Sequence, residues 1–322
     1  MNAPPISVVM PLYNNAAVVR RAIDSVLRQS VPRFELIIVN DGSTDGGDAI
    51  ARQTGDGRVR VVDQANKGVS AARNRGIAEA GADLVAFLDA DDEWKPDFLE
   101  TIERLVHGYP DCAVFATHYF YRELDGSTRL PILRKVPQGD WEGILDDYFG
   151  VAASSDPPVW SSAVAVRKSA LLSVGGFPEG IAIGEDLLTW ARMATTYPIA
   201  YSTKPGAVFW LRAPLTGFPT RIPETPDRVG VELERLFDVL PLPRRRSFSR
   251  YMAMWHRMRA SMFVQLGDRK NALADVKRMA RYGATDPRVY IYGSMAIMPK
   301  MIRKFVLQFF TLVRAVRRKI ER

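Results

Sequence analysis

The sequence is poor in cysteine and in histidine. Its 322 residues include one cysteine, Cys112, and three histidines. A single cysteine cannot form an internal disulfide, and it cannot supply a metal site built from several thiolates. Because disulfides are typical of oxidising compartments, this composition favours a protein of a reducing compartment.

Long apolar runs are also missing. A membrane-spanning helix needs about 20 apolar residues, and the longest candidates, 289–298 and 305–313, are shorter and separated by basic residues. The first residues contain no basic stretch followed by an apolar core, so no signal peptide is predicted. No G-x-G-x-x-G follows the first predicted strand, which disfavours a dinucleotide-binding dehydrogenase.

Charge is distributed unevenly along the chain, whose formal net charge is +8. From Arg244 onward there are 20 Lys and Arg against 4 Asp and Glu, a net charge of +16, which leaves −8 for the preceding part. We expect a mildly acidic body with a basic C-terminal part. Such a part favours an anionic partner, either nucleic acid or a membrane surface.

Short β-branched runs alternate with helical patterns in the first third of the chain. The predicted strands are 6–10, 34–40, 59–63, 83–88 and 113–118, and the predicted helices are 17–29, 45–53, 68–80 and 96–109. This alternation indicates a parallel sheet covered on both faces. Ligands of such sheets bind at the carboxyl ends of the strands.

The rest of the chain is less regular. We expect a hairpin at 119–133, strands at 157–166, 199–202 and 207–212, and helices at 168–174 and 185–197. Residues 213–227 are rich in Pro and Thr and are the expected boundary. Helices are predicted beyond it at 229–239, 247–266 and 269–281, and from 298 onward.

Polar and aromatic side chains follow the first four strands. Tyr13 follows the first strand, Asp41 the second, Arg73 the third, and an acidic run the fourth. They supply an aromatic ring, an acceptor for a base N–H, a cation for phosphate and carboxylates for a divalent metal. A nucleotide-sugar site requires such a set of groups.

The acidic run is the most informative of these segments. Asp89, Asp91 and Asp92 place three carboxylates within four residues, and these repel one another unless a cation lies among them. Mg²⁺ and Mn²⁺ take oxygen ligands and often bridge protein carboxylates to substrate phosphates. Helix capping by Asp91 or Asp92 is the alternative, but it uses only one of the three. The run therefore favours a divalent metal site.

Four motifs resemble those of family 2 inverting glycosyltransferases with the A-type fold. They are VVMPLYNN, VNDGSTDGG, NKGVSAARNRG and FLDADDEWKPDFLE, within residues 6–100, with weaker matches in VGGFPE and GEDLLTWARMA. The resemblance implies an α/β fold with a nucleotide-sugar-binding mixed sheet flanked by helices and a C-terminal helical extension. It also implies transfer of a sugar from a nucleotide-diphosphate donor, with a UDP-sugar expected.

The resemblance implies roles for the residues of the donor site. Pro11 and Tyr13 would line the base and ribose site, and Asp41 would accept the N–H of a uracil-type ring. Arg73 would face the diphosphate. Asp41 as a turn-forming residue, Tyr13 as a packing residue, and one of Arg73 and Arg75 as a solvated group remain the structural alternatives.

The resemblance also implies a metal motif and a base. Asp89 and Asp91, with Asp92 beside them, would bind Mn²⁺ or Mg²⁺. Asp186 would be the general base, with Glu185 next to it in the substrate site. Acids at a helix start are also common because of the helix dipole alone, which is the alternative for this pair.

One segment departs from the pattern of the family. Many relatives carry Arg-x-His after the last strand, and here Arg212 matches while the histidine is missing. We therefore expect no histidine at this position to bind the metal in addition to the aspartates and the donor phosphates.

The C-terminal tail combines apolar and basic residues at helical spacing. An amphipathic cationic helix of this kind suits an anionic membrane interface, and a helix packed on the protein body is the alternative. We expect a catalytic domain at 1–213, a helical extension at 214–297 and a basic amphipathic helix at 298–322. Residues 267–287 resemble one tetratricopeptide-like hairpin, and a single unit cannot establish a repeat array.

These observations lead to one functional expectation and one alternative. We expect a metal-dependent inverting hexosyltransferase. It would extend a lipid-linked saccharide acceptor in the synthesis of a cell-surface polysaccharide or glycan. It would lie in the cytoplasm on the inner face of the cell membrane, without a nucleic-acid partner. The alternative is a catalytically inactive scaffold that binds a nucleotide-sugar.

Overall fold

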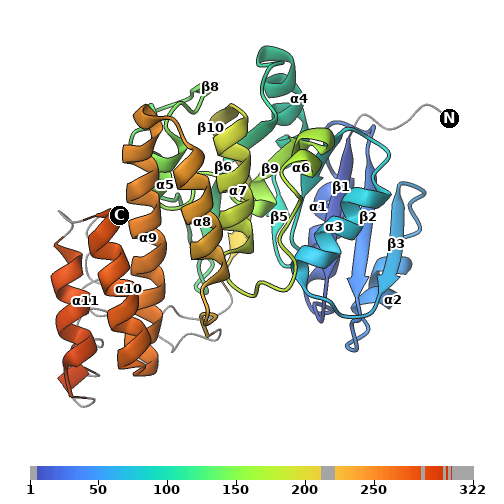
Figure 1. The fold of residues 1–322 in the computed structure, drawn as a ribbon. Coiled ribbons are helices and arrows are strands. Elements are labelled where there is room, and N and C mark those ends of the chain that lie inside the picture. Colours follow the sequence, from blue (N-terminus) through green and yellow to red (C-terminus); the bar gives the residue numbers. More distant parts are fainter. Residues whose placement is uncertain (1–5, 212–221, 284–286, 300–301, 304–305, 307–322) are drawn as a thin grey trace. The chain divides into compact units, whose positions relative to one another are not determined.

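Two units make up the protein, residues 1–212 and 213–322. The structure is a computed structural model, and it describes residues 6–211, 222–283, 287–299, 302, 303 and 306 (Figure 1). Each unit has its own core and is described by itself.

A mixed β-sheet organises the N-terminal unit (Figure 1). The strand order is β3-β2-β1-β4-β9-β6-β10-β5, with β7 paired to β6 and β8 to β10. The strands are β1 (Ser7–Leu12), β2 (Glu35–Asp41), β3 (Val59–Gln64), β4 (Leu84–Phe87), β5 (Glu93–Trp94), β6 (Val114–Arg122), β7 (Thr128–Arg129), β8 (Glu142–Ile144), β9 (Val164–Arg167) and β10 (Ile199–Trp210). Strands β1 to β4 are parallel, and β9 runs antiparallel to both β4 and β6. The predicted α/β fold class with a mixed sheet is confirmed.

Helices cover both faces of the sheet. The helices of this unit are α1 (Val19–Leu27), α2 (Gly47–Arg52), α3 (Val69–Glu79), α4 (Phe98–Gly108), α5 (Tyr148–Ser154), α6 (Lys168–Ser173) and α7 (Glu185–Thr196). Helices α1 and α4 share one core with Val8 and Met10 of β1. On the opposite face α3 packs so closely that a Cβ at Gly76 would lie 2.3 Å from Cγ1 of Val9. Only glycine allows this close packing of α3 on β1.

Two predicted strands near the end of this unit are a single strand. Strand β10 runs continuously along β6, with register shifts on either side of Pro205. Proline cannot donate a backbone hydrogen bond and is tolerated in a strand at such irregularities. In contrast, the strand expected from 157 begins only at Val164, after a short 3₁₀ turn at Ser161–Ala163. The predicted hairpin is confirmed by the antiparallel pairing of β6 with β7.

The C-terminal unit is helical in its described part. Its helices are α8 (Arg228–Val239), α9 (Leu242–Leu266), α10 (Arg269–Tyr282) and α11 (Arg288–Ile297). Gly267, with φ +82°, ends α9, and the side chain of Asp268 caps α10 by accepting a hydrogen bond from the Asn271 N–H at 3.1 Å. Helix α11 was not predicted. No helix in the described ranges combines the length and the apolarity needed to cross a membrane.

Three of the sequence-based expectations involve residues outside the described ranges. These are the role of Arg212, part of the boundary at 213–227, and most of the basic helix at 298–322.

Candidate active site at the carboxyl edge of the sheet

The register of the sheet brings the ends of three strands together. Val9 of β1 lies opposite Phe87 of β4, and Leu12 of β1 lies opposite Asn40 of β2. The residues that follow these strands therefore leave the sheet at one edge, as expected for parallel strands. Pro11 is buried within β1, whereas Tyr13, directly after it, is 49% exposed.

Asp41 fixes the loop that leads into α3. Its Oδ1 accepts hydrogen bonds from the Gln64 side chain at 2.7 Å and from the Lys67 N–H at 2.9 Å, and its Oδ2 accepts one from the Gly68 N–H at 2.9 Å. The carboxylate is buried. Asp41 therefore has the local structural role that was given above as the alternative to base binding. Its contact with a base stays a prediction.

Arg73 connects the acidic run to the start of α7. Its guanidinium donates a hydrogen bond to Asp89 Oδ1 at 2.7 Å, and its Nη1 lies 3.6 Å from Glu185 Oε1. It also lies over the Phe177 ring, 5.1 Å from the centroid. Burial lowers the pKa of Arg73, but the Asp89 and Glu185 carboxylates raise it by more, so the group stays charged. The side chain is only 4% exposed, so Arg73 orients carboxylates in this structure. Its contact with a diphosphate stays a prediction.

Arg75 is the solvated member of the arginine pair. It lies on the surface and pairs with Glu79 one helical turn later, at 2.9 Å. Surface pairs of this kind contribute little to stability.

Asp92 is held inside the protein. Its Oδ2 accepts a hydrogen bond from the Ser162 hydroxyl at 2.7 Å, and its Oδ1 accepts one from the Trp210 N–H at 3.3 Å. The same hydroxyl accepts a hydrogen bond from the Asp89 N–H at 3.0 Å. Burial, and then the Asp91 and Asp89 carboxylates, raise the pKa of Asp92 well above its ordinary value. Both oxygens are thus engaged, and this geometry fits a support for the acidic run better than a ligand.

Asp186 lies in the first turn of α7, beside the Arg73 group. Its Oδ1 accepts a hydrogen bond from the Leu187 N–H at 2.7 Å. Burial raises the pKa of Asp186, and the nearby Arg73 guanidinium offsets this only in part. A carboxylate with a raised pKa binds a proton more tightly, which is what a general base requires.

Asn74 ties the loop before α7 to α3. Its side-chain amide donates to the Phe177 carbonyl at 2.8 Å and to Glu179 Oε1 at 3.0 Å, and its Oδ1 accepts from the Phe177 N–H at 2.9 Å. These bonds join two segments about 100 residues apart. They explain how Glu185 and Asp186 come to lie next to Arg73.

The structure therefore brings together four of the predicted residues around Arg73, with Asp91 and Asp92 next to Asp89 in the acidic run. Asp89, Arg73, Glu185 and Asp186 interact directly or through Arg73. Pro11, Tyr13 and Asp41 share the edge of the sheet with them, without a hydrogen bond or an ion pair to this group among the described contacts.

The sequence reasoning missed three residues of the site, which are Asn74, Ser162 and Phe177. Asn74 belongs to the NKGVSAARNRG motif and Phe177 to VGGFPE, so the motifs contained a signal for both. Ser162 lies in no motif.

Two groups of acidic residues lie close enough together to be considered as metal sites. At the sheet edge, Asp89 and Asp91 are partly exposed, and Asp89 contacts Arg73, the residue expected to face the diphosphate. Mg²⁺ is commonly held by one or two carboxylates together with substrate phosphates, so this pair fits such an ion.

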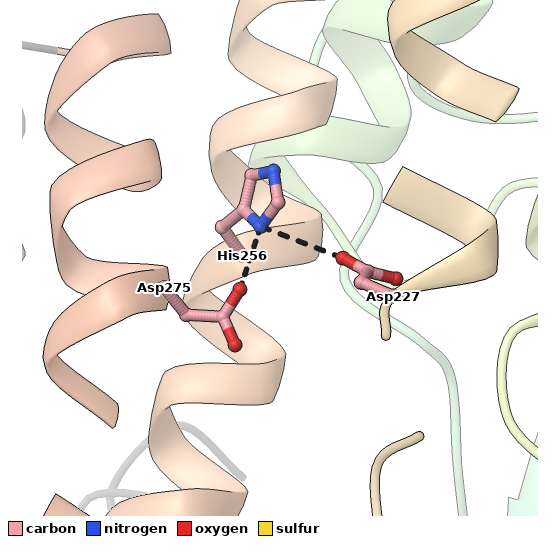
Figure 2. A group of neighbouring side chains, drawn as sticks. All are labelled: Asp227, His256 and Asp275. Atoms are coloured by element: carbon pink, nitrogen blue, oxygen red, sulfur yellow. Dashed lines mark hydrogen bonds and ion pairs between the residues drawn. The ribbon is translucent and has the colours of Figure 1, made fainter. Parts of the chain in front are cut away.

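The second group is in the C-terminal unit, where Asp227, His256 and Asp275 bring potential ligand atoms within 4.8 Å of one another (Figure 2). Its carboxylates already accept hydrogen bonds from N–H donors. Arg259 Nε lies 3.2 Å from an oxygen of each aspartate, and Trp255 Nε1 donates to Asp227 Oδ2 at 3.0 Å. The arginine supplies the positive charge that a metal would bring. This group fits a buried ion-pair network.

The chain is similar in sequence to known glycosyltransferases. Residues 7–155 match the family model of Glycosyl transferase family 2. Glycosyltransferase GlyA of Streptococcus pneumoniae is 33% identical over 130 residues, which are 40% of this chain and 19% of GlyA. The alignments cover only 19% to 50% of the lengths of the curated relatives that the chain matches.

Solved structures extend the similarity to most of the chain. S. aureus TarS 1–349, in complex with UDP-GlcNAc, superposes with a TM-score of 0.66 at 18% identity, over 89% of this chain and 83% of TarS. The mannosyltransferase PcManGT of Pyrobaculum calidifontis, in complex with GDP-Man and Mn²⁺, gives a TM-score of 0.54 at 19% identity, over 98% of this chain and 87% of PcManGT. At these identities the similarity shows the shared fold.

Proposed function

We propose that this chain is an inverting glycosyltransferase of family 2, because residues 7–155 match the model of that family. It transfers a sugar from a nucleotide-diphosphate donor, a UDP-sugar, to a hydroxyl of a saccharide acceptor. The observation that carries this proposal is the group in which buried Arg73 holds Asp89 beside Glu185, with Asp186 next to it.

The proposed reaction is a single displacement. Asp186 removes the proton from the acceptor hydroxyl, whose oxygen forms a bond to the anomeric carbon. The bond from that carbon to the diphosphate oxygen breaks, and the nucleoside diphosphate leaves with its electron pair. Arg73 holds the Asp89 carboxylate in place throughout, because its own guanidinium is fixed by Glu185 and by the Phe177 ring.

Asp89 and Asp91 would hold a Mn²⁺ or Mg²⁺ ion together with the donor phosphates. Such an ion would stabilise the negative charge that develops on the departing diphosphate. The TarS complex with UDP-GlcNAc and the PcManGT complex with GDP-Man and Mn²⁺ support a nucleotide-sugar and a divalent ion in a site of this fold.

Donor binding can be tested by thermal stabilisation. A ligand that binds only the folded state stabilises it by about 2.7 kcal/mol at 100 times its dissociation constant. We expect UDP to raise the melting temperature more with Mn²⁺ than without it, and Asp91→Ala to abolish the difference. Asp111→Ala, which removes an exposed aspartate elsewhere in this unit, is the matched control. A Mn²⁺-dependent shift that persists in Asp91→Ala would contradict the metal assignment.

Turnover distinguishes the enzyme from the inactive scaffold. A panel of UDP-sugars incubated with the protein and Mn²⁺ should show release of UDP for at least one donor. Tight UDP binding without release from any donor, with saccharide acceptors present, would favour the scaffold.

The acceptor and the location belong to the same proposal. The acceptor would be a lipid-linked saccharide from the synthesis of a cell-surface polysaccharide or glycan. Its lipid would hold it at the inner face of the cell membrane. Residues 298–322, which combine apolar and basic side chains, would bind that surface from the cytoplasm. The division into three domains, 1–213, 214–297 and 298–322, stays a prediction within this proposal, with catalysis assigned to 1–213.

A further inference from the structure

One side of α11 exposes large apolar side chains. Tyr290 is 74% exposed, Ile291 42% and Ile297 56%. Tyr290 and Ile297, seven residues apart, lie almost in line along the helix, and Ile291 lies about 100° further around it on the same exposed side. Met295 and Ala296, on the other side, are buried in the core of the unit. We call Tyr290, Ile291 and Ile297 the apolar stripe.

The neighbouring helix α10 exposes basic side chains. Lys270, Lys277, Arg278 and Arg281 are all exposed, at i, i+7, i+8 and i+11, and we call them the cationic stripe. The only acidic residue of α10 is Asp275, which is 1% exposed.

The position of Asp275 leaves the cationic stripe without an exposed carboxylate on its own helix. Its side chain bonds His256 at 2.8 Å and Arg259 at 3.2 Å inside the unit, and Arg278 approaches it only to 3.9 Å. Helix α11 contains no acidic residue at all.

The two stripes belong to helices that pack on each other. Ala272 of α10 shares a core with Met295 and Ala296 of α11. Packed helices lie about 8–10 Å apart, which is close to the screening length of about 10 Å at 0.1 M salt. An anionic surface in contact with the apolar stripe would therefore feel the charges of α10.

We propose that α10 and α11 form a docking surface for an anionic lipid membrane. The apolar stripe enters the boundary between headgroups and acyl chains, with Tyr290 as an aromatic side chain of the kind favoured there. The cationic stripe adds attraction to anionic headgroups. A nucleic acid would use the charges but would leave Ile291 and Ile297 in water, so the apolar stripe favours the membrane. The surface is independent of residues 307–322 and of the proposed transferase activity.

A site-specific label tests whether the apolar stripe enters lipid. The only cysteine, Cys112, is 2% exposed, so Tyr290→Cys provides a single accessible thiol for a polarity-sensitive fluorophore. We expect the emission at 290 to shift to the blue with vesicles of phosphatidylcholine and phosphatidylserine. Val239→Cys is the matched control, because Val239 is 79% exposed in the same unit but lies on α8. No shift at 290, or an equal shift at 239, would overturn the proposal whatever the tail does.

Charge reversal tests the cationic stripe. Since each basic residue near an anionic surface contributes roughly a fivefold factor in affinity, Lys270→Glu with Lys277→Glu and Arg281→Glu should weaken vesicle binding by at least about 100-fold. The control reverses Arg28, Arg33 and Lys95, which are exposed in the N-terminal unit, for the same change in net charge. Equal weakening by both triple variants would show only a net-charge effect and would overturn the proposal. So would stronger binding to single-stranded RNA than to the anionic vesicles.

Discussion

Replacing Asp186 with asparagine should separate the stability of the protein from its activity. The amide keeps the shape of the side chain but cannot take a proton from the acceptor. We expect turnover to fall by about a hundredfold or more, which is the scale of a general base. We also expect the variant to be more stable than the wild type near neutral pH.

The gain in stability follows from the raised pKa of Asp186. Burial disfavours its charged form, and Arg73 compensates only in part. Each unit by which the pKa of Asp186 is raised in the folded state lowers the stability of the wild type by about 1.4 kcal/mol at neutral pH. Asparagine avoids this loss of stability because it carries no charge. A gain of 1 kcal/mol raises the melting temperature by about 2–4 °C in a domain of 150–250 residues.

The effect has a defined pH dependence. The folded state binds the Asp186 proton more tightly than the unfolded chain, whose pKa is near 3.8. The stabilisation from protonated Asp186 is therefore complete below 3.8 and is lost as pH rises through the higher pKa of the folded state. The asparagine variant lacks this term, so its advantage over the wild type should shrink with acid.

The assay is a series of melting curves from pH 4 to 8 for both proteins, together with turnover at pH 7. Asp48→Asn is the matched control, because Asp48 also lies in the first turn of a helix, α2, and asparagine there should not raise stability. A variant that is less stable at pH 7, with a difference that does not change with pH, would refute the electrostatic reasoning. Turnover within a few-fold of the wild type would move the base elsewhere, with Glu185 as the next candidate.

Two further predictions concern residues that support the site. Arg73→Met should lower the free energy of unfolding by about 3 kcal/mol in urea titrations, because it removes a buried cation that pairs with Asp89 and Glu185. Arg75→Met should lower it by less than about 1 kcal/mol. Equal losses would contradict the buried pairing. Ser162→Ala should cost about 1–3 kcal/mol in the same titrations because the Asp92 oxygen and the Asp89 N–H each lose a partner. Ser161→Ala, which removes a buried hydroxyl without a hydrogen bond among the described residues, should be nearly neutral, and the reverse order would contradict the assigned network.

The sequence predicted the first half of the sheet well, because its strands are continuous apolar runs with charged residues directly after them. β10 was predicted as two strands, because Pro205 and Gly206 are breakers by propensity, and the pairing with β6 overrides that preference over the whole length. Helix α11 was missed, because its apolar run has no clear helical start and is held by contacts with α9 and α10.

The candidate site was predicted as a set of residues but not as an arrangement. Motif order indicated that Arg73 and Asp89 belong together, whereas the pairing with Glu185 depends on Asn74 bonding a loop about 100 residues away. The burial of Asp92 depends on Ser162, which no pattern in the sequence marks. Contacts between distant segments are set by tertiary packing, which local spacing does not encode.

The buried network of Asp227, His256, Asp275 and Arg259 limits how the C-terminal unit can be shortened. Asp227 precedes α8, His256 and Arg259 lie on α9, and Asp275 lies on α10, so one cluster cross-links three helices. A chain that ends at the turn between α9 and α10 would keep Arg259 but lose one of its two carboxylates, and the imidazole of His256 would lose its closest partner. Although residues 267–287 resemble a repeat hairpin, α10 is therefore not a separable module: a truncation that removes it should destabilise α8 and α9 as well.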